Sequence, residues 1–351
     1  MLKNQNMDSK KKILVCRTDD LKSLVLTIPV FSALKKLYPG AHIGALTSPS
    51  TAPILKNNPF IDHIIVDDKD DSHKGAAGFV KLSKEIEHHK FDTAIIAYSN
   101  WRLLSLAVSA GIKKRIANGF RPYLPLINQP VWLHKSHPPI NETNYVMSFV
   151  NHLKYYDGEI NQPVIYLTES EKKNALKWLK EKTENKNNII GIHPRTANPA
   201  FTLSLDMWVR IARQAANFTN SESIIITGTK DDKTIAERIC KAIGKNAISI
   251  AGELNLRQLC AVQSCLKLYI APNCGLFQTA AASGTSVLGL FPPLISLSKT
   301  KWKPDNAKVQ VLQPNLEKLC VKCNYSKCRL YPCLDTITPE DINKALENLI
   351  P

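Results

Sequence analysis

The residues best suited to bind an anion lie in the turn Asn273-Cys274-Gly275, between an apolar run and a run of small residues. The apolar run predicts a strand, and the small residues predict a helix that lies close to the sheet. A glycine turn before a helix N-terminus leaves backbone N–H groups free to bind a phosphate. The same pattern is also typical of an ordinary strand-turn-helix connection with a tightly packed helix.

Two further polar turns follow predicted strands. The segment TGTKDD contains Thr227, Gly228 and Asp232, and an acidic side chain here could accept a ribose hydroxyl or simply favour the N-terminus of the next helix. His193 ends another predicted strand and precedes Pro194. This position is compatible with a donor contact and equally with a histidine satisfied within its own turn.

Four of the nine cysteines crowd into one segment, at Cys320, Cys323, Cys328 and Cys333. A Cys-x2-Cys pair followed by two more cysteines can supply four thiolates to a structural zinc ion. Because the spacings differ from those of a standard zinc ribbon, free or redox-labile thiols and disulfides are the alternatives. The other five cysteines occur singly, where a thiol packs as a small apolar group.

Standard nucleotide-binding and hydrolase signatures are absent from the sequence. Neither GxGxxG nor GxxxxGK[ST] occurs, which disfavours a nicotinamide dehydrogenase and a P-loop kinase. HExxH and GxSxG are also missing. Any nucleotide must therefore be held by a less stereotyped arrangement.

The charge balance is strongly basic, with 46 Lys and Arg against 30 Asp and Glu and a formal net charge of +16. A basic surface suits an anionic membrane leaflet, phosphorylated substrates or nucleic acid, or it is simply a solvated face. The basic residues are spread along the chain without an arginine-rich tract or an RNA motif, which disfavours nucleic acid. No apolar run approaches the roughly 18–20 residues of a membrane span, and the start lacks a signal-peptide core. We expect a cytoplasmic protein.

Alternating strand and helix patterns must position these turns. The expected strands are Ile13–Arg17, His42–Leu46, His63–Val66, Ala94–Ala97, Ile189–His193, Ser223–Thr227, Ala247–Ile250, Leu268–Ala271 and Ser286–Phe291. The expected helices include Val25–Leu37, Lys81–His89, Leu205–Ala216, Lys233–Ile243, Leu256–Ser264 and Pro339–Ile350, the last capped by Thr338. Fully apolar strands between helices predict parallel sheets covered on both faces. We also expect Trp101, Trp132, Trp208 and Trp302 to pack in the core or between domains.

The two halves begin alike, with KKILVCRTDD in the first and NKNNIIGIHPRT in the second. We therefore predict two Rossmann-like domains, residues 1–163 and 164–351, the second including the cysteine-rich segment. Ligands bind at the carboxyl ends of the strands in such sheets, so a central cleft is expected there.

The chain resembles glycosyltransferase family 9, the heptosyltransferases of lipopolysaccharide core synthesis. The resemblance runs nearly end to end and includes ILVCRTDDLKSLVLTIPVFSALKKLYPGAHIGALTSP, NNPFIDHIIVDD, IIGIHPRT, PNCGLFQTAAASGTSVLGLFPP and CLDTITPEDINKAL. It implies the GT-B fold, an acceptor in the first domain, a nucleotide sugar in the second, and inverting transfer without a metal or other required cofactor.

Three positions depart from the family pattern. The general base of the family, an Asp, is replaced by Ser23, whose hydroxyl pKa is too high for that role, so Asp19 or Asp20 is the expected base. The donor turn has Asn273, Cys274 and Gly275 where Asp-Thr-Gly is usual, and Gln278 replaces a His. A Lys that neutralises the diphosphate is missing, and Arg195 in the same loop could take its place.

The expected function is transfer of a heptose-like sugar from an ADP-heptose-like donor to a lipopolysaccharide core glycolipid, at an anionic membrane surface on the inner face of the cytoplasmic membrane. The alternative is a catalytically degenerate member that binds a sugar nucleotide or glycolipid or acts as a scaffold. Nucleic acid is not an expected partner. The expected donor-binding residues are His193, Arg195, Thr227, Gly228, Asp232, Asn273, Cys274, Gly275 and Gln278. The expected acceptor-binding residues are Arg17, Lys22, Ser23 and Arg121.

Overall fold

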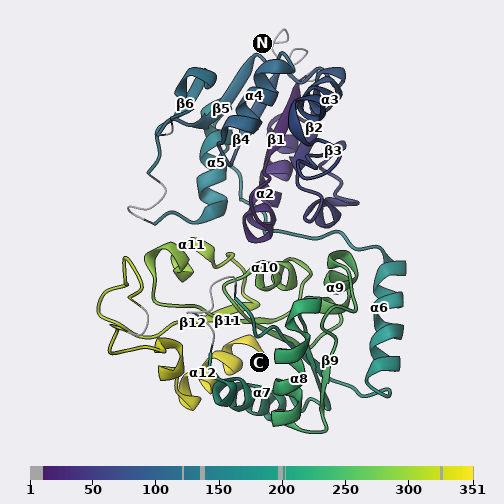
Figure 1. Ribbon diagram of the computed structural model, residues 1–351, viewed down its shortest axis with the longest axis vertical. Coiled ribbons are helices and arrows are strands. Elements are labelled where there is room, and N and C mark those ends of the chain that lie inside the picture. The colour runs from purple at the N-terminus through teal and green to yellow at the C-terminus, as the bar shows by residue number, and fades with distance from the viewer. Residues whose placement is uncertain are drawn as a thin grey trace. The chain divides into compact units, whose positions relative to one another are not determined.

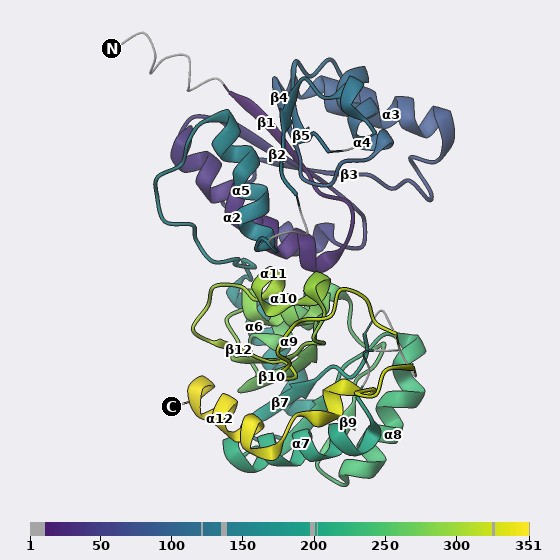
Figure 2. The ribbon, with the colours of Figure 1, turned by 90° about the vertical axis from the view of Figure 1, so that its left-hand side faces the viewer.

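The computed structural model describes residues 11–120, 122–134, 139–196, 201, 203–324 and 327–350. The chain divides into two compact units, Met1–Pro163 (unit 1) and Val164–Pro351 (unit 2). Each unit is a parallel six-stranded sheet with helices on both of its faces (Figures 1 and 2).

The sheet of unit 1 has the strand order β3-β2-β1-β4-β5-β6. Its strands are β1 (Lys12–Cys16), β2 (His42–Thr47), β3 (His63–Val66), β4 (Thr93–Ile96), β5 (Lys114–Asn118) and β6 (Gln129–Val131). Its helices are α2 (Leu21–Leu37), α3 (Gly75–His88), α4 (Trp101–Ser109) and α5 (Glu142–Leu153). Helices α2 and α5 lie on one face of the sheet, and α3 and α4 lie on the other (Figure 2).

This two-sided cover explains the apolar sequences of the central elements. Strand β1 reads KILVC and is buried from its second residue onward. Every residue of α2 from Ser23 to Leu34 is buried, because the helix packs between the sheet and α5. On the opposite face, Leu14 and Cys16 of β1 belong to one core cluster with residues of α3 and α4.

Unit 2 repeats the same order, β12-β11-β10-β7-β8-β9. Its strands are β7 (Ile189–Ile192), β8 (Ser223–Ile226), β9 (Ala247–Ser249), β10 (Leu268–Pro272), β11 (Val287–Leu290) and β12 (Val309–Leu312). Its helices are α6 (Glu169–Lys182), α7 (Leu205–Thr219), α8 (Lys233–Ile243), α9 (Leu256–Gln263), α10 (Gly275–Ala282), α11 (Lys299–Trp302) and α12 (Pro339–Leu349). The core between the sheet and helices α7, α8 and α12 includes Trp208, which is 1% exposed.

In both units the strand order reverses beside the first strand, between β1 and β4 and between β7 and β10. Ligands of doubly wound sheets bind at this point, outside the carboxyl ends of the strands. Strands β1 and β4 end in register, with Cys16 opposite Ile96. The loops after β1 and β4 therefore leave the sheet side by side.

The predicted fold class is confirmed, and each of the nine predicted strands exists with ends shifted by no more than a residue or two. Thr338 caps α12 as expected, through a hydrogen bond from the Asp341 N–H. Strands β5, β6 and β12 were not predicted. They are short, and β6 and β12 are edge strands with polar residues or a proline, so that they carry no clear apolar run.

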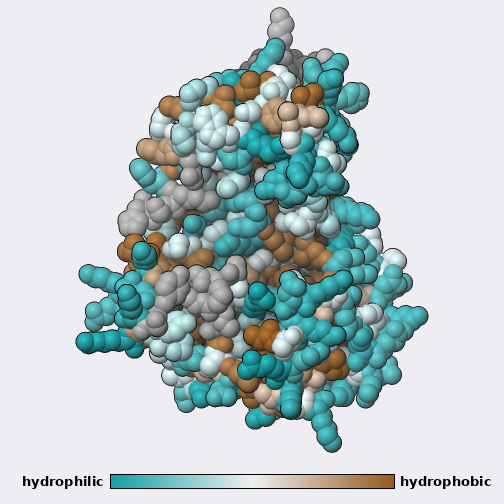
Figure 3. Space-filling view, in the orientation of Figure 1, coloured by the Kyte–Doolittle hydropathy of each residue, from teal (hydrophilic) through white to brown (hydrophobic). Residues whose placement is uncertain are grey.

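Among the residues that the structure describes, no helix is both long and apolar enough to cross a bilayer. The face shown in Figure 3 is mainly hydrophilic.

Candidate functional site

The loops after β1, β2, β3 and β4 surround a cavity of about 640 Å³, here called the unit 1 crevice. It lies at the point where the strand order of unit 1 reverses. Its lining residues are Thr18, Asp19, Asp20, Ser48, Asp67, Lys69, Tyr98, Asn100, Trp101, Arg102, Leu103 and Tyr123. Both candidate bases therefore face one cavity.

Asp19 is bound by the buried guanidinium of Arg17. Arg17 Nε lies 2.7 Å from Asp19 Oδ1, and Nη2 lies 2.9 Å from Oδ2, so both carboxylate oxygens accept a hydrogen bond. Arg17 Nη2 also donates to Glu142 Oε1 at 2.8 Å, and Glu142 is fully buried. Burial alone would lower the pKa of Arg17, but the charges of Asp19 and Glu142 outweigh it and raise that pKa. This arrangement makes Asp19 a structural partner of Arg17.

Asp20 is exposed and lies at the N-cap of α2. Its Oδ1 accepts a hydrogen bond from the Ser23 N–H at 2.8 Å, as a capping side chain does. None of the described residues donates to its Oδ2. One oxygen of Asp20 is thus available to a ligand in the unit 1 crevice.

The other predicted acceptor-side residues lie elsewhere. Ser23 is 1% exposed in the first turn of α2, and Lys22 is half-buried beside it, outside the lining of the crevice. Arg121 lies outside the described residues.

Sequence reasoning missed an ion pair in the same crevice. Arg102 of α4 donates from Nε and Nη2 to the two oxygens of Asp67, at 2.8 and 2.7 Å. Its Nη2 also donates to the carbonyl of His73. The hydrogen bonds to Asp67 raise the pKa of Arg102. Asp67 directly follows β3. This position at the carboxyl end of a strand is the sequence feature that could have identified it as a site residue.

Three aromatic side chains complete the lining of the crevice. Tyr98 is 41% exposed and Trp101 is 55% exposed. The rings of Trp101 and Tyr123 meet edge to face, with centroids 5.0 Å apart and an interplanar angle of 79°. The expectation of core packing is wrong for Trp101 and Trp132, since each is 55% exposed. The same expectation is confirmed for Trp208 and Trp302, which are 1% and 5% exposed.

In unit 2, the loops after β7 and β8 bring His193 next to Thr227. His193 Nδ1 lies 3.2 Å from the carbonyl oxygen of Thr227. Burial lowers the pKa of His193, so the ring is neutral near pH 7. The Thr227 hydroxyl is also buried, 2.7 Å from the hydroxyl of Tyr269. His193 and Thr227 are therefore buried at the carboxyl ends of the strands and do not form an exposed contact surface.

Asp232 is held by its own turn and by Arg195. Its Oδ2 accepts from the N–H and the hydroxyl of Thr229, and its Oδ1 accepts from Arg195 Nη1. Burial alone would raise the pKa of Asp232, but the hydrogen bonds from Thr229 and Arg195 lower it. A Cβ on Gly228 would lie 2.6 Å from Asp232 Cβ, which explains the glycine. The Arg195 side chain is 53% exposed and so faces solvent from this anchored position.

The turn before α10 has the expected form. Cys274 is the N-cap of α10 and makes no side-chain cap hydrogen bond, and Gly275 begins the helix. Asn273 Nδ2 donates to the carbonyl of Leu297 at 2.9 Å, and its Oδ1 has no hydrogen-bond partner among the described residues. Gln278 is 1% exposed, and its Nε2 donates to the carbonyl of Trp302 at 2.6 Å. Gln278 is thus placed inside the unit, where it anchors α11.

The four clustered cysteines are free thiols, which is one of the states that the sequence left open. Within the described part of the chain, no group of three or more His, Cys, Asp or Glu residues could hold a metal ion. All nine cysteines are free thiols, so the disulfide alternative is not observed either. Cys320 and Cys323 pack against the core of unit 2, and burial is the main cause that raises the pKa of Cys333.

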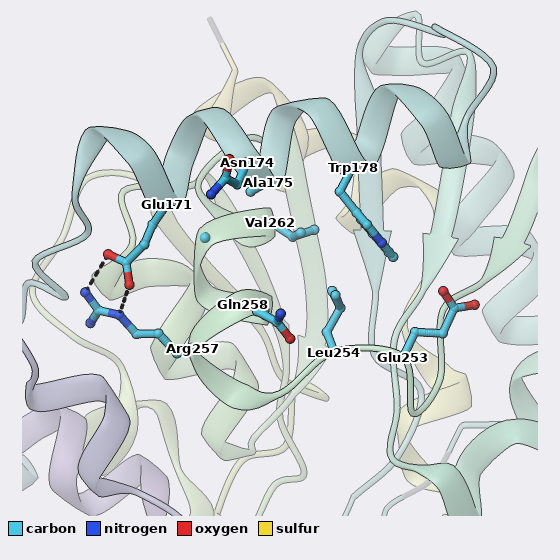
Figure 4. Close-up of a pocket in the computed structure, with 10 residues that line it drawn as sticks. Glu171, Asn174, Ala175, Trp178, Glu253, Leu254, Arg257, Gln258 and Val262 are labelled. Carbon is cyan, nitrogen blue, oxygen red and sulfur yellow. Dashed lines mark hydrogen bonds and ion pairs between the residues drawn. The ribbon is translucent and has the colours of Figure 1, made fainter.

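A second cavity, of about 320 Å³, lies between α6 and α9 (Figure 4). Arg257 spans its end and donates from Nε and Nη2 to both oxygens of Glu171, at 2.8 and 2.9 Å. These hydrogen bonds lower the pKa of Glu171 to about 2. None of the predicted donor-binding residues lines this cavity. We interpret the Arg257–Glu171 ion pair as a contact that holds α6 and α9 together.

The sequence of the chain is similar to those of known glycosyltransferases. Residues 79–332 match the sequence model of glycosyltransferase family 9 (heptosyltransferase). The chain is 23% identical to lipopolysaccharide heptosyltransferase 3 of Escherichia coli over 335 residues, which cover 93% of this chain and 96% of the relative.

Two solved structures share the fold. A glycosyltransferase family 9 protein from Veillonella parvula superposes with a TM-score of 0.84 at 20% identity and covers 97% of both chains. ADP-heptose lipopolysaccharide heptosyltransferase II of E. coli superposes with a TM-score of 0.77 at 18% identity, covering 96% of this chain and 98% of that one.

Proposed function

The chain belongs to glycosyltransferase family 9, the heptosyltransferase family, and is therefore a sugar-transferring enzyme; on this premise we propose that it transfers a heptose from an ADP-heptose-like donor to a lipopolysaccharide core acceptor. The donor part of the proposal is supported by the E. coli structural relative, whose name specifies ADP-heptose. The acceptor part is supported by the E. coli sequence relative, which is named for lipopolysaccharide.

We place the donor in unit 2, at the carboxyl edge of β7 and β10. The first N–H groups of α10 have no carbonyl acceptor within the helix, and we propose that they bind the diphosphate. Arg195 adds an exposed guanidinium that is anchored by Asp232.

We place the acceptor in the unit 1 crevice, with Asp20 as the general base. The observation that carries this assignment is the contrast between the two carboxylates. Both oxygens of Asp19 are bound by Arg17, whereas Asp20 is exposed and uses only Oδ1 for its cap. The hydroxyl oxygen of the acceptor would attack the anomeric carbon of the donor, and ADP would leave. Asp20 would accept the proton of this hydroxyl.

Inversion and independence from metal belong to the same proposal. One base and one attacking hydroxyl describe a single displacement, which inverts the anomeric centre. The charge that develops on the leaving diphosphate would be stabilised by Arg195 and the N–H groups of α10, without a divalent cation. Full turnover in the presence of EDTA is the expected result, and loss of activity that Mg²⁺ restores would contradict this part.

The proposal also includes peripheral binding to the inner face of the cytoplasmic membrane, supported by the net charge of +16. Sedimentation should then be stronger with anionic than with zwitterionic vesicles, and should weaken with added salt.

The main test is calorimetric titration of ADP-heptose followed by a turnover assay on deacylated core acceptor. Binding together with transfer supports the proposal. Binding without transfer, even with enzyme in excess of acceptor, would support a scaffold that has kept the fold. Absence of donor binding would reject both.

A further inference from the structure

We infer that the acceptor sugar ring that enters the unit 1 crevice carries no phosphate group and is held mainly by its stacking on aromatic side chains. This inference rests on the proposed function, because it specifies the acceptor class of the same site. It is carried by the aromatic lining of the crevice and by the distribution of its charges.

The indole of Trp101 is exposed and is held in place before any ligand binds. Tyr98 and Trp101 are 41% and 55% exposed, although large aromatic side chains are usually well buried. Asn100 caps α4 by accepting a hydrogen bond from the Leu103 N–H at 2.9 Å, which fixes the first helical residue, Trp101. Tyr123 then supports the indole edge to face. Rigid aromatic faces give binding area at low entropic cost, and the C–H face of a sugar ring is their natural complement.

The charges of the crevice do not favour a phosphate. Arg102 lines it, but its guanidinium is bound to both oxygens of Asp67 and to the carbonyl of His73. Arg17 is 1% exposed and bound to two carboxylates. The Nε–Nη2 fork of Arg102 and the guanidinium of Arg17 are thus already bound to carboxylates.

The remaining charged groups of the described lining also disfavour a phosphate. Asp20 is exposed, Asp19 lies next to it, and the exposed Lys69 adds a single flexible ammonium. A phosphate monoester carries close to two negative charges near pH 7 and would have to approach these carboxylates. Neutral sugar hydroxyls instead can donate to the carboxylates and accept from Asn100 and Ser48. The crevice is therefore suited to a neutral, hydroxyl-rich ring in a chain that is otherwise strongly basic.

The test compares two probes, a methyl heptopyranoside and the same glycoside carrying one phosphate monoester. Binding to the full-length protein is followed by saturation-transfer NMR and by tryptophan fluorescence. We expect the unphosphorylated glycoside to bind at least several-fold more tightly than its phosphate. Trp101→Ala should weaken its binding by about tenfold, the upper range for a lost aromatic contact.

Trp132→Ala is the matched control, because Trp132 has the same 55% exposure in the same unit but does not line the crevice. It should bind the glycoside like the wild type. Equal or tighter binding of the phosphate, no effect of Trp101→Ala, or no binding of either probe would each overturn the inference.

The proposed function is tested by separate measurements, namely ADP-heptose binding and transfer to the core acceptor. Transfer to an acceptor whose reacting ring is phosphorylated would leave the function intact and reject the inference. Loss of all donor binding and transfer would reject the function, whatever the glycoside probes do.

Discussion

Replacing Asp20 with Asn should separate catalysis from folding at the N-terminus of α2. Asp20 Oδ1 caps the helix by accepting from the Ser23 N–H at 2.8 Å. An Asn side chain keeps a carbonyl oxygen in this place and is as good an N-cap as Asp. It cannot, however, accept the proton of an acceptor hydroxyl.

The magnitudes follow from these two roles. Because the cap persists, the free energy of unfolding should change by no more than about 0.5 kcal/mol. Loss of a general base should lower kcat by about 10²- to 10⁴-fold, which corresponds to roughly 2.7–5.5 kcal/mol of activation free energy. The affinity for the donor, which we place in unit 2, should not change.

Asp19→Asn provides the contrasting variant. It removes a negative charge from the buried Arg17, which is held through both Asp19 oxygens, and should lower stability by about 2–4 kcal/mol. Urea unfolding gives the stabilities of both variants, and ADP release in the presence of core acceptor gives the rates. Wild-type turnover by Asp20→Asn, or a larger loss of stability in this variant than in Asp19→Asn, would refute the assignment.

Three further predictions concern charged side chains, namely the buried Glu142 and Arg257 and the exposed Arg195. Glu142→Gln should destabilise the protein by about 2–4 kcal/mol in urea unfolding, because Glu142 is fully buried against Arg17, and unchanged stability would contradict the role of this pair. Arg257→Ala should be less stable than wild type above pH 5. Because Arg257 is the largest cause of the lowered pKa of Glu171, which is about 2, this difference should shrink as the pH falls from 4.5 towards 2. A pH-independent difference would show that the ion pair contributes little. Arg195→Ala should weaken ADP-heptose binding by about 10- to 100-fold in calorimetry, and an unchanged affinity would remove Arg195 from the donor site.

The fold was largely accessible from the sequence, because buried parallel strands produce apolar runs such as ILVC that stand out between helices. The strands that escaped prediction lie away from the centre of each sheet. Strand β5 begins with two charged residues, and β6 contains a proline in its three residues. Their positions depend on pairing with a neighbour already in place, which a local pattern does not reveal.

The site was only partly accessible. The turns at Asn273–Gly275 and Thr227–Asp232 were found because they directly follow apolar strands. Our proposal of Asp20 rather than Asp19 as the base rests on contacts of Arg17 that the sequence does not reveal, since Arg17 and its second partner Glu142 are 125 residues apart. The exposure of Trp101 was also hidden, because large aromatics are usually buried and only the geometry of α4 places this one in a crevice.

The most direct test of the proposed activity is mass spectrometry of deacylated lipopolysaccharide core incubated with the protein and ADP-heptose. The account predicts a product heavier by one heptose residue, formed together with an equal amount of ADP and absent with Asp20→Asn on the same time scale. An acceptor of unchanged mass, with the enzyme in excess and the donor demonstrably bound, would contradict it.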